Sequence, residues 1–401
     1  MTTTTEQMRS WTGPAILTYG FRPFFFGAAV WAALAMVFWV LMLSGRMALP
    51  TAFDPVSWHA HEFLFGYLLA VVAGFLLTAV PNWTGRLPIV GWPLGGLFGF
   101  WVIGRIAIAF SEALSPFTVA FLDLTMPTVL AIVIAREIVA GKNWRNLIVL
   151  GMLCALILGN AVFHWEAAHG HYAAQGYGLR IGLGAGIMMI AVIGGRIVPS
   201  FTRNWLVKQG AETRPVSPMQ RFDKIALLSL LAALVAWVVL PVSIMSASLL
   251  AIAGALHLAR LTRWAGVYTG AEPLVAVLHV AYLLVALGAL AIATEIMLPV
   301  IAGLGAAQHL WMGGAIGLMT LAVMTRATLG HTGHSLKAGA GTIAIYTCVL
   351  SATVLRGVAG LWPGYAQELY WAAGLSWFVA FAGFAALYGP LLLRLSPAQK
   401  T

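Results

Sequence analysis

The chain has 401 residues, of which 61% are hydrophobic and only 8% are charged. A soluble globular domain carries about 25% charged residues, so this composition excludes a soluble protein and indicates an integral membrane protein. The net charge of +10 does not point to a nucleic-acid partner, because basic residues concentrate in the cytoplasmic loops of membrane proteins. The two cysteines, Cys154 and Cys348, lie within apolar runs and are expected to be packing residues, not a disulfide or thiolate site.

Twelve apolar runs are long enough to cross a bilayer as helices, which takes about 20 residues each. In chain order they cover residues 22–44, 58–80, 90–110, 116–139, 146–165, 174–194, 222–240, 242–260, 272–295, 300–324, 339–359 and 366–393. No soluble domain fits between them. The sequence therefore predicts an all-α integral membrane protein of about twelve transmembrane helices, forming a single polytopic domain over residues 1–401.

The basic residues predict the orientation of these spans. If both termini lie on one side, only four of the 22 Lys and Arg residues fall on the opposite side, and the remaining 18 share the side of the termini; the four are Arg46, Arg105, Arg180 and Arg356. Cytoplasmic loops carry the excess of Lys and Arg. We therefore expect both termini to be cytoplasmic, with no cleaved signal segment.

Three similar segments follow spans two, six and ten, and each holds a threonine close to an arginine. They are Val80–Arg86, Val198–Arg203 and Val323–Arg326, which we expect to be cytoplasmic loops. Because each comes four spans after the previous one, they predict a threefold pseudo-repeat of four helices, roughly 20–140, 141–265 and 266–393. The alternative is chance similarity between short loop sequences.

The segment Trp58-His59-Ala60-His61-Glu62 stands at the start of the second apolar run. Ionisable residues inside a membrane span are costly and mark function by default. At 100° per residue, helical positions i and i+2 point about 200° apart. If both residues are helical, His59 and His61 cannot ligate one metal, but they can serve two centres on opposite sides of the helix.

The predicted topology brings further histidines to the same non-cytoplasmic face. His164, His169 and His171 surround the end of span five, and His309 lies about a third of the way into span ten. Histidine is the commonest metal ligand, and two histidines from facing helices are a standard way to hold haem. Any single one of them has a plainer interpretation as a packing or loop residue. His279, in span nine and nearer the cytoplasm, is a further candidate ligand or a structural residue.

His164 shares a helix face with Asn160, four residues earlier, which makes Asn160 a candidate partner for a ligand. Glu62 is a candidate proton relay or a residue that orients a histidine, and its alternative is a carboxylate favoured by the start of a helix. Arginine pairs bidentately with carboxylates, so Arg105, Arg180 and Arg356 suit haem propionates unless they only anchor the helix ends at the interface.

The longest motifs of the chain resemble the NnrS family. They are Phe21-Arg22-Pro23-Phe24-Phe25, Trp58-His59-Ala60-His61-Glu62, Ala79–Arg86, Gly159-Asn160 with Phe163-His164, Gly194–Leu206 and Val323–Gly333. The resemblance implies a bacterial inner-membrane protein with haem and copper, linked to nitric oxide stress during denitrification. The family's loop usually ends Gly-His-Thr-Gly-Arg, whereas here His334 stands in the last position.

A weaker, architectural resemblance links the chain to haem–copper oxidases and nitric oxide reductases. Those proteins also have twelve helices in a threefold pseudo-repeat, and their haem ligands lie in helices two and ten. Here the histidine doublet is in span two and the single His309 is in span ten, and span seven has no histidine. The copper ligands of the oxidases therefore cannot be transferred to this chain.

Three functions stay open on the sequence. The chain reduces nitric oxide at a centre of haem and metal, or it binds and delivers haem, copper or nitrosyl species without turnover, or it is a secondary transporter. For the first, we expect one or two b-type haems and copper, with nitric oxide as ligand, an electron donor still unknown, and no nucleic-acid partner. We expect His309 and His61 to ligate haem, and His59 to form a second metal site with His164 and with His169 or His171.

Overall fold

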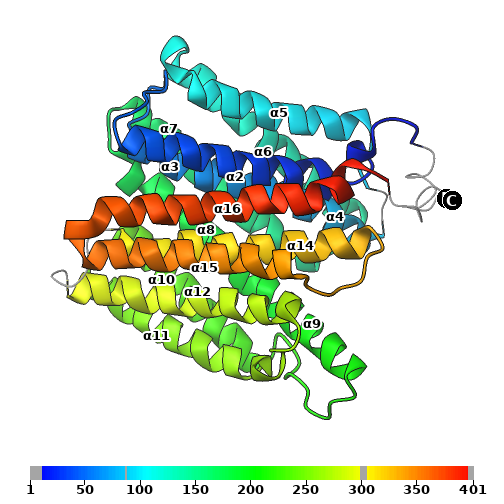
Figure 1. Cartoon of the computed structure of the whole chain (residues 1–401). Coiled ribbons are helices and arrows are strands. Elements are labelled where there is room, and N and C mark those ends of the chain that lie inside the picture. Colours follow the sequence, from blue (N-terminus) through cyan, green and yellow to red (C-terminus); the bar gives the residue numbers. More distant parts are fainter. Residues whose placement is uncertain (1–10, 86–87, 299–304, 396–401) are drawn as a thin grey trace. The chain divides into compact units, whose positions relative to one another are not determined.

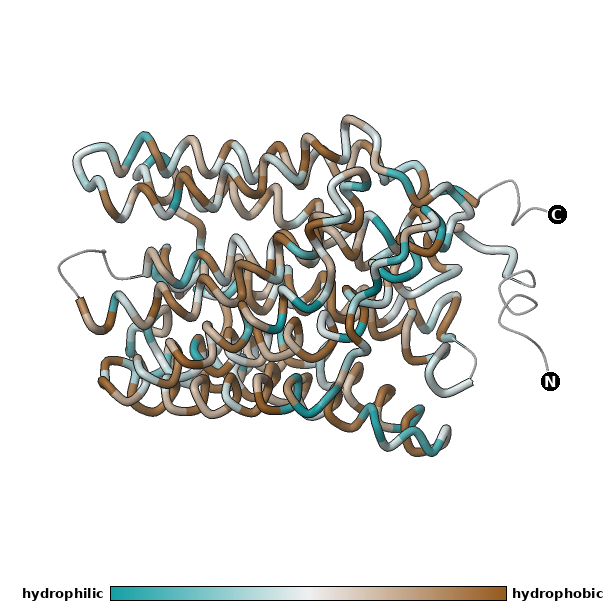
Figure 2. The backbone as a smooth tube through the Cα atoms, turned by 90° about the horizontal axis from the view of Figure 1, so that it is seen from below, coloured by the Kyte–Doolittle hydropathy of each residue, from teal (hydrophilic) through white to brown (hydrophobic). Residues whose placement is uncertain are grey.

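The computed structural model describes residues 11–85, 88–298 and 305–395. The chain is 81% helical, and no strand occurs within the described ranges. Twelve helices are long and apolar enough to cross a membrane, so the predicted fold class is confirmed. Hydrophobic colour dominates the helical tube in Figure 2. The chain is a multi-pass membrane protein.

Nine of the twelve spans consist of one regular helix each. They are α2 (Phe21–Leu43), α5 (Trp92–Ala109), α6 (Pro116–Ala140), α7 (Leu147–Ala168), α10 (Arg221–Val239), α11 (Ile244–Thr262), α12 (Pro273–Met297), α15 (Ala340–Leu361) and α16 (Ala366–Leu393). Short 3₁₀ turns lie between or beside them at η1 (Ala15–Leu17), η3 (Ser111–Ala113), η4 (Trp144–Asn146), η5 (Ala173–Gln175), η7 (Gly266–Tyr268) and η9 (Pro363–Tyr365).

The other three spans, the second, sixth and tenth, each contain a π-helical segment between two α-helical parts. They are α3 (Pro55–His61), η2 (Glu62–Tyr67) and α4 (Leu68–Thr84); α8 (Tyr177–Met189), η6 (Ile190–Gly194) and α9 (Gly195–Lys208); and α13 (Ala306–His309), η8 (Leu310–Leu318) and α14 (Met319–His331). Short π segments inside α-helices are rare and frequently mark functional sites. Two of the three begin directly after a histidine, His61 or His309.

The second span begins at Pro55, three residues before the predicted start. The side chain of Asp54 accepts hydrogen bonds from the backbone N–H groups of Val56 and Ser57, both at 3.0 Å. An N-cap aspartate followed by proline at the first helical position is a strong helix start. The aspartate accepts hydrogen bonds from backbone N–H groups that have no partner within the helix, and the proline has no N–H that would need one. His59 and His61 consequently lie within a regular α-helix, α3.

The three segments predicted as cytoplasmic loops are helical instead. Thr84 lies in α4, Thr202 in α9 and Thr325 in α14. Their hydroxyls donate to backbone carbonyls one turn earlier, at 2.9, 2.9 and 3.0 Å, as threonines inside helices do. The spans are therefore longer than the apolar runs, and the sixth reaches Lys208. Arg86, at the end of the first segment, lies outside the described residues, and the threefold repeat stays a prediction.

The chain forms two compact units. The first comprises residues 1–182, 327–335 and 381–401. Within it, α5 packs against α6, α6 packs against α7, and α2 packs against α4 (Figure 1). Buried Arg22 of α2 donates hydrogen bonds to the carbonyls of Leu391 and Leu392, which ties the end of α16 to this unit.

The second unit comprises residues 183–326 and 336–380. Here α11 packs against both α10 and α12, and η8 packs against α12 and α15. Large apolar side chains such as Leu228 and Ile244 stay exposed on the outer helices, as expected for residues that face lipid. Arg260 and Asp223 form a buried ion pair between α11 and α10, with 2.8 Å between Nε and Oδ1.

Candidate metal centre

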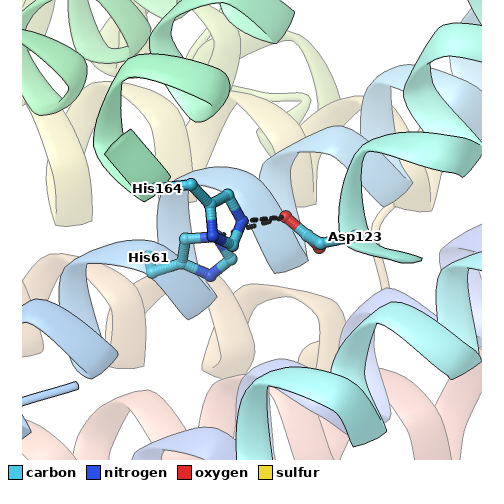
Figure 3. Close-up of side chains that lie close together, drawn as sticks. All are labelled: His61, Asp123 and His164. Atoms are coloured by element: carbon cyan, nitrogen blue, oxygen red, sulfur yellow. Dashed lines mark hydrogen bonds and ion pairs between the residues drawn. The ribbon is translucent and has the colours of Figure 1, made fainter. Parts of the chain in front are cut away.

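Three side chains from three helices of the first unit meet in a buried cluster. They are His61 at the end of α3, Asp123 two turns into α6, and His164 near the end of α7. One ligand atom from each lies within 4.8 Å of the other two. Figure 3 shows the two imidazole rings close together, with the Asp123 carboxylate directed toward them. Two imidazoles and a carboxylate are ligands of transition metals in proteins.

The spacing of the three ligand atoms fits a metal ion. The Oδ2 atom of Asp123 lies 3.2 Å from Nε2 of His61 and 3.1 Å from Nε2 of His164. Ligands that bind a metal tetrahedrally at about 2.0–2.1 Å are separated from each other by about 3.3 Å. An ion between the three atoms therefore needs only small movements of the side chains. We refer to His61, Asp123 and His164 as the metal cluster.

Glu62 orients the His61 ring. Its Oε1 atom lies 3.0 Å from Nδ1 of His61, so the ring donates this N–H to the carboxylate and keeps Nε2 toward the cluster. A carboxylate that holds the second nitrogen of a histidine in this way is the usual support of a metal-bound imidazole. The position of Glu62 agrees with its expected role in orienting a histidine, and no contact given by the structure tests a proton relay.

Asn160 spans two members of the metal cluster. Its Nδ2 atom donates to Oδ2 of Asp123 at 2.7 Å, and its Oδ1 atom lies 3.0 Å from Nε2 of His61. The sequence suggested Asn160 as a partner of His164, because the two share one face of a helix. In the structure, its hydrogen bonds go to the other two members of the cluster.

Arg105 of α5 binds both carboxylates of the region. Its guanidinium donates to Oε1 of Glu62 at 2.6 Å and forms an ion pair with Oδ1 of Asp123. Because this pairing takes Oδ1, the other oxygen of Asp123 is left for the two imidazoles. Arg105 was expected to bind a haem propionate, but its guanidinium is engaged with these two protein carboxylates.

Two glycines make room for these ion pairs. A Cβ atom at Gly66, in η2, would lie 2.5 Å from Nη1 of Arg105 and 2.9 Å from Oε2 of Glu62. A Cβ atom at Gly104 would lie 3.1 Å from Oδ1 of Asp123. All three distances are shorter than an ordinary contact, so a larger residue at either position would displace the charged groups.

His59 is directed away from the metal cluster. Its ring stacks on Trp39 of α2 at a centroid distance of 4.3 Å and lies 4.7 Å from the ring of Phe63. The two histidines of the doublet thus have different surroundings, as their spacing on a helix requires. His164 was predicted as a partner of His59, but it lies against His61, with ring centroids 5.1 Å apart.

His169 and His171 are exposed and lie outside the metal cluster. Both pack on Trp165, at centroid distances of 4.5 and 6.0 Å, and Nδ1 of His169 donates to the carbonyl of Trp165 at 2.8 Å. Both rings thus lie against Trp165, near the end of α7. The predicted site of His59 with these two residues therefore has no counterpart among the described contacts.

His309, in the second unit, has the hydrogen bonding of a metal-ligating histidine. Its Nδ1 atom donates to the carbonyl of Gly305 at 2.6 Å, which directs Nε2 away from the backbone. The carboxylate of Glu295 accepts hydrogen bonds from the N–H groups of Gly305 and Ala307, at 3.0 and 3.3 Å. These bonds hold the backbone just before His309. This arrangement leaves Nε2 as the ring nitrogen that could bind a ligand. The pairing of His309 with the doublet of span two stays a prediction.

The remaining candidates have protein partners of their own. His279 lies in α12 with Nε2 2.7 Å from the hydroxyl of Thr202. Arg180 donates to the carbonyl of Gln175 at 2.5 Å, and Arg356 lies over the ring of Tyr370 at 4.8 Å. Their predicted contacts with haem or metal stay predictions.

Asp123 was not recognised from the sequence. It is a carboxylate inside an apolar span, and the rule that singled out Glu62 applies to it equally. The signal was therefore present, but nothing along the chain shows that Asp123 meets Arg105 and two histidines, because those contacts join four helices.

Comparison with known proteins identifies a family. The model of the NnrS family, described as NnrS protein, matches residues 15–395, which is nearly the whole chain. No curated protein matches the chain.

Proposed function

The chain belongs to the NnrS family, and from this premise we propose that it binds nitric oxide at a metal centre within the membrane and reduces it. Membership of the family supports a role in the nitric oxide response. The observation that supports a metal centre is the metal cluster, because three ligand atoms at metal-like spacing are buried in a membrane span. The binding of copper and haem is part of the proposal.

We propose that His61, Asp123 and His164 hold copper. Bound there, copper supplies a coordination position for nitric oxide and a one-electron couple. Glu62 holds the His61 ring in place through Nδ1, and Arg105 holds Asp123 so that a single oxygen faces the ion. Asn160, fully buried, has its amide directed at the same point. The chain thus orients His61 and Asp123 through side chains that do not bind the metal themselves.

We also propose that His309 ligates a b-type haem, since its Nδ1 is already bonded to the backbone. His61 belongs to the metal cluster, so its predicted role as a haem ligand is not part of this proposal. Reduction of nitric oxide consumes protons as well as electrons. Glu62 lies next to His61 and suits the transfer of a proton at Oε1, and an external one-electron donor supplies the electrons.

Steady turnover tests this function. The full-length protein, purified in detergent with its metals, is expected to consume nitric oxide continuously under anaerobic conditions when a reductant is present. Uptake that stops after one equivalent would instead support a binding or delivery protein. The optical spectrum of the same sample is expected to show a b-type haem, and a sample without haem or copper would leave the secondary transporter as the better explanation.

We further propose that the chain lies in the bacterial inner membrane with both termini in the cytoplasm. The 18-to-4 distribution of Lys and Arg supports this orientation, although three of the 18, Arg9, Arg86 and Lys400, lie outside the described residues. A phosphatase fused to the C-terminus, which is active only outside the cytoplasm, is expected to be inactive. Strong activity of this fusion would contradict the orientation.

A further inference from the structure

The fixed charges around the metal cluster set the charge of the ion that it binds best. Three charged side chains lie at the site: Glu62, Asp123 and Arg105. Resting on the proposed copper centre, we infer that the site stabilises a monovalent, cuprous ion over a divalent one, and that Arg105 and Glu62 tune this preference in opposite directions.

Both carboxylates form ion pairs with the guanidinium of Arg105, so we count each as one negative charge. Glu62 accepts from the guanidinium of Arg105 at 2.6 Å through Oε1 and from the indole N–H of Trp31 at 2.6 Å through Oε2. Asp123 accepts from Arg105 through Oδ1 and from the amide N–H of Asn160 at 2.7 Å through Oδ2. Arginine, tryptophan and the amide nitrogen can only donate, so the carboxyl oxygens that they contact are acceptors.

The fixed charge of the site is therefore minus one. Two carboxylates contribute minus two and Arg105 contributes plus one, while the histidines that bind metal are neutral. A cuprous ion makes the site neutral, whereas a cupric ion leaves it with a charge of plus one. Glu62 and Asp123 are 0% and 3% exposed, and an uncompensated charge at such a depth is unfavourable. The neutral, cuprous state is accordingly the more stable one.

Arg105 has a second effect, on geometry. It pairs with Oδ1 of Asp123 and so leaves one oxygen for the ion, which keeps the carboxylate from binding through both oxygens. A single hard oxygen beside two imidazoles gives less stabilisation to a cupric ion than a bidentate carboxylate would. Arg105 is thus a positioning residue that acts through Asp123, and its charge and its geometry favour the same oxidation state.

The test is a charge series in the full-length, copper-loaded protein, with the copper reduction potential followed by EPR titration. Arg105→Gln makes the fixed charge minus two and is expected to lower the potential. Glu62→Gln makes it zero and is expected to raise the potential. We expect at least a tenfold change in the ratio of cuprous to cupric affinity in each direction, equal to about 59 mV for one electron. Arg105→Lys keeps the charge and is expected to stay closer to the wild type.

Glu137→Gln is the matched control. Glu137 is a buried carboxylate on the same helix as Asp123, but about 21 Å further along it at 1.5 Å per residue, so the potential is expected to stay unchanged. If Arg105→Gln fails to fold, Glu62→Gln and Arg105→Lys still decide the question. Copper bound at an unmoved potential in Glu62→Gln overturns this inference alone. A wild-type protein that binds no copper overturns the metal centre as well.

Discussion

Asp123→Ala is expected to destabilise the protein by about 3–5 kcal/mol. The substitution leaves Arg105 with one carboxylate partner in place of two and removes the acceptor of His164, His61 and Asn160. The loss is costly because the N–H groups of Arg105 and Asn160 that donated to Asp123 are left without an acceptor away from water. The measurement is the thermal midpoint of tryptophan fluorescence in detergent, which is expected to fall by several degrees, together with the yield of protein that does not aggregate.

A charge-free variant separates stability from metal binding. In Asp123→Leu, Arg105→Met, Glu62→Gln, all three charges are gone and similar volumes stay filled. Replacing buried ion pairs by apolar residues is often neutral or stabilising, so the midpoint is expected to return near the wild type. Its metal content is expected to stay low. If Asp123→Ala proved as stable as the wild type, the ion pair would not be as buried as the structure describes.

The second large effect concerns the histidines. His61→Ala and His164→Ala are each expected to lower the copper affinity at least 100-fold, since even the loss of a residue that only supports a ligand costs 10- to 100-fold. Both variants should lose the same metal, because both rings contact the same oxygen of Asp123. His59→Ala is expected to keep its copper, since its ring packs on Trp39. Elemental analysis of the purified variants measures this directly.

His169→Ala and His171→Ala serve as controls, because both side chains are exposed and pack on Trp165. They are expected to keep copper at the wild-type level. Equal losses in the His59 and His61 variants would show that the doublet serves one centre, and the exclusion of His59 from the metal cluster would then be wrong.

The positions of the spans followed from the sequence because hydrophobic length is a strong signal in a membrane protein. The ends were less predictable. Asp54-Pro55 is a recognisable helix-start signal, but the apolar run that defined the predicted span begins only after it, so the helix starts earlier than predicted. Pro81 and Pro199 belong to segments predicted as loops, but both lie inside helices, where prolines of membrane proteins are tolerated if nearby groups satisfy the backbone.

The candidate site was only partly predictable. The position of His61 and Glu62 in an apolar run marked them, and helical spacing showed that His59 faces elsewhere. The partner of each histidine was not predictable, because His61 and His164 are brought together by the packing of α6 with α7 and of α4 with α6. Asp123 joins them from a third helix, and only the structure shows that its two oxygens are divided between an arginine and the imidazoles.

The depth of the metal cluster has a kinetic consequence. Its members are 0%, 3% and 6% exposed and come from α3, α6 and α7. During synthesis at about 5–20 residues per second, His164 emerges roughly 5–20 s after His61, so the site does not exist until the fifth span has been made. After assembly, we expect an ion bound in the metal cluster to leave only when these helices separate, because all three side chains are buried. The residence time of the ion in the metal cluster is then set by the rate of local unfolding of the first unit. A chelator is expected to remove the ion at this unfolding rate, and not at the faster rate at which it binds free metal.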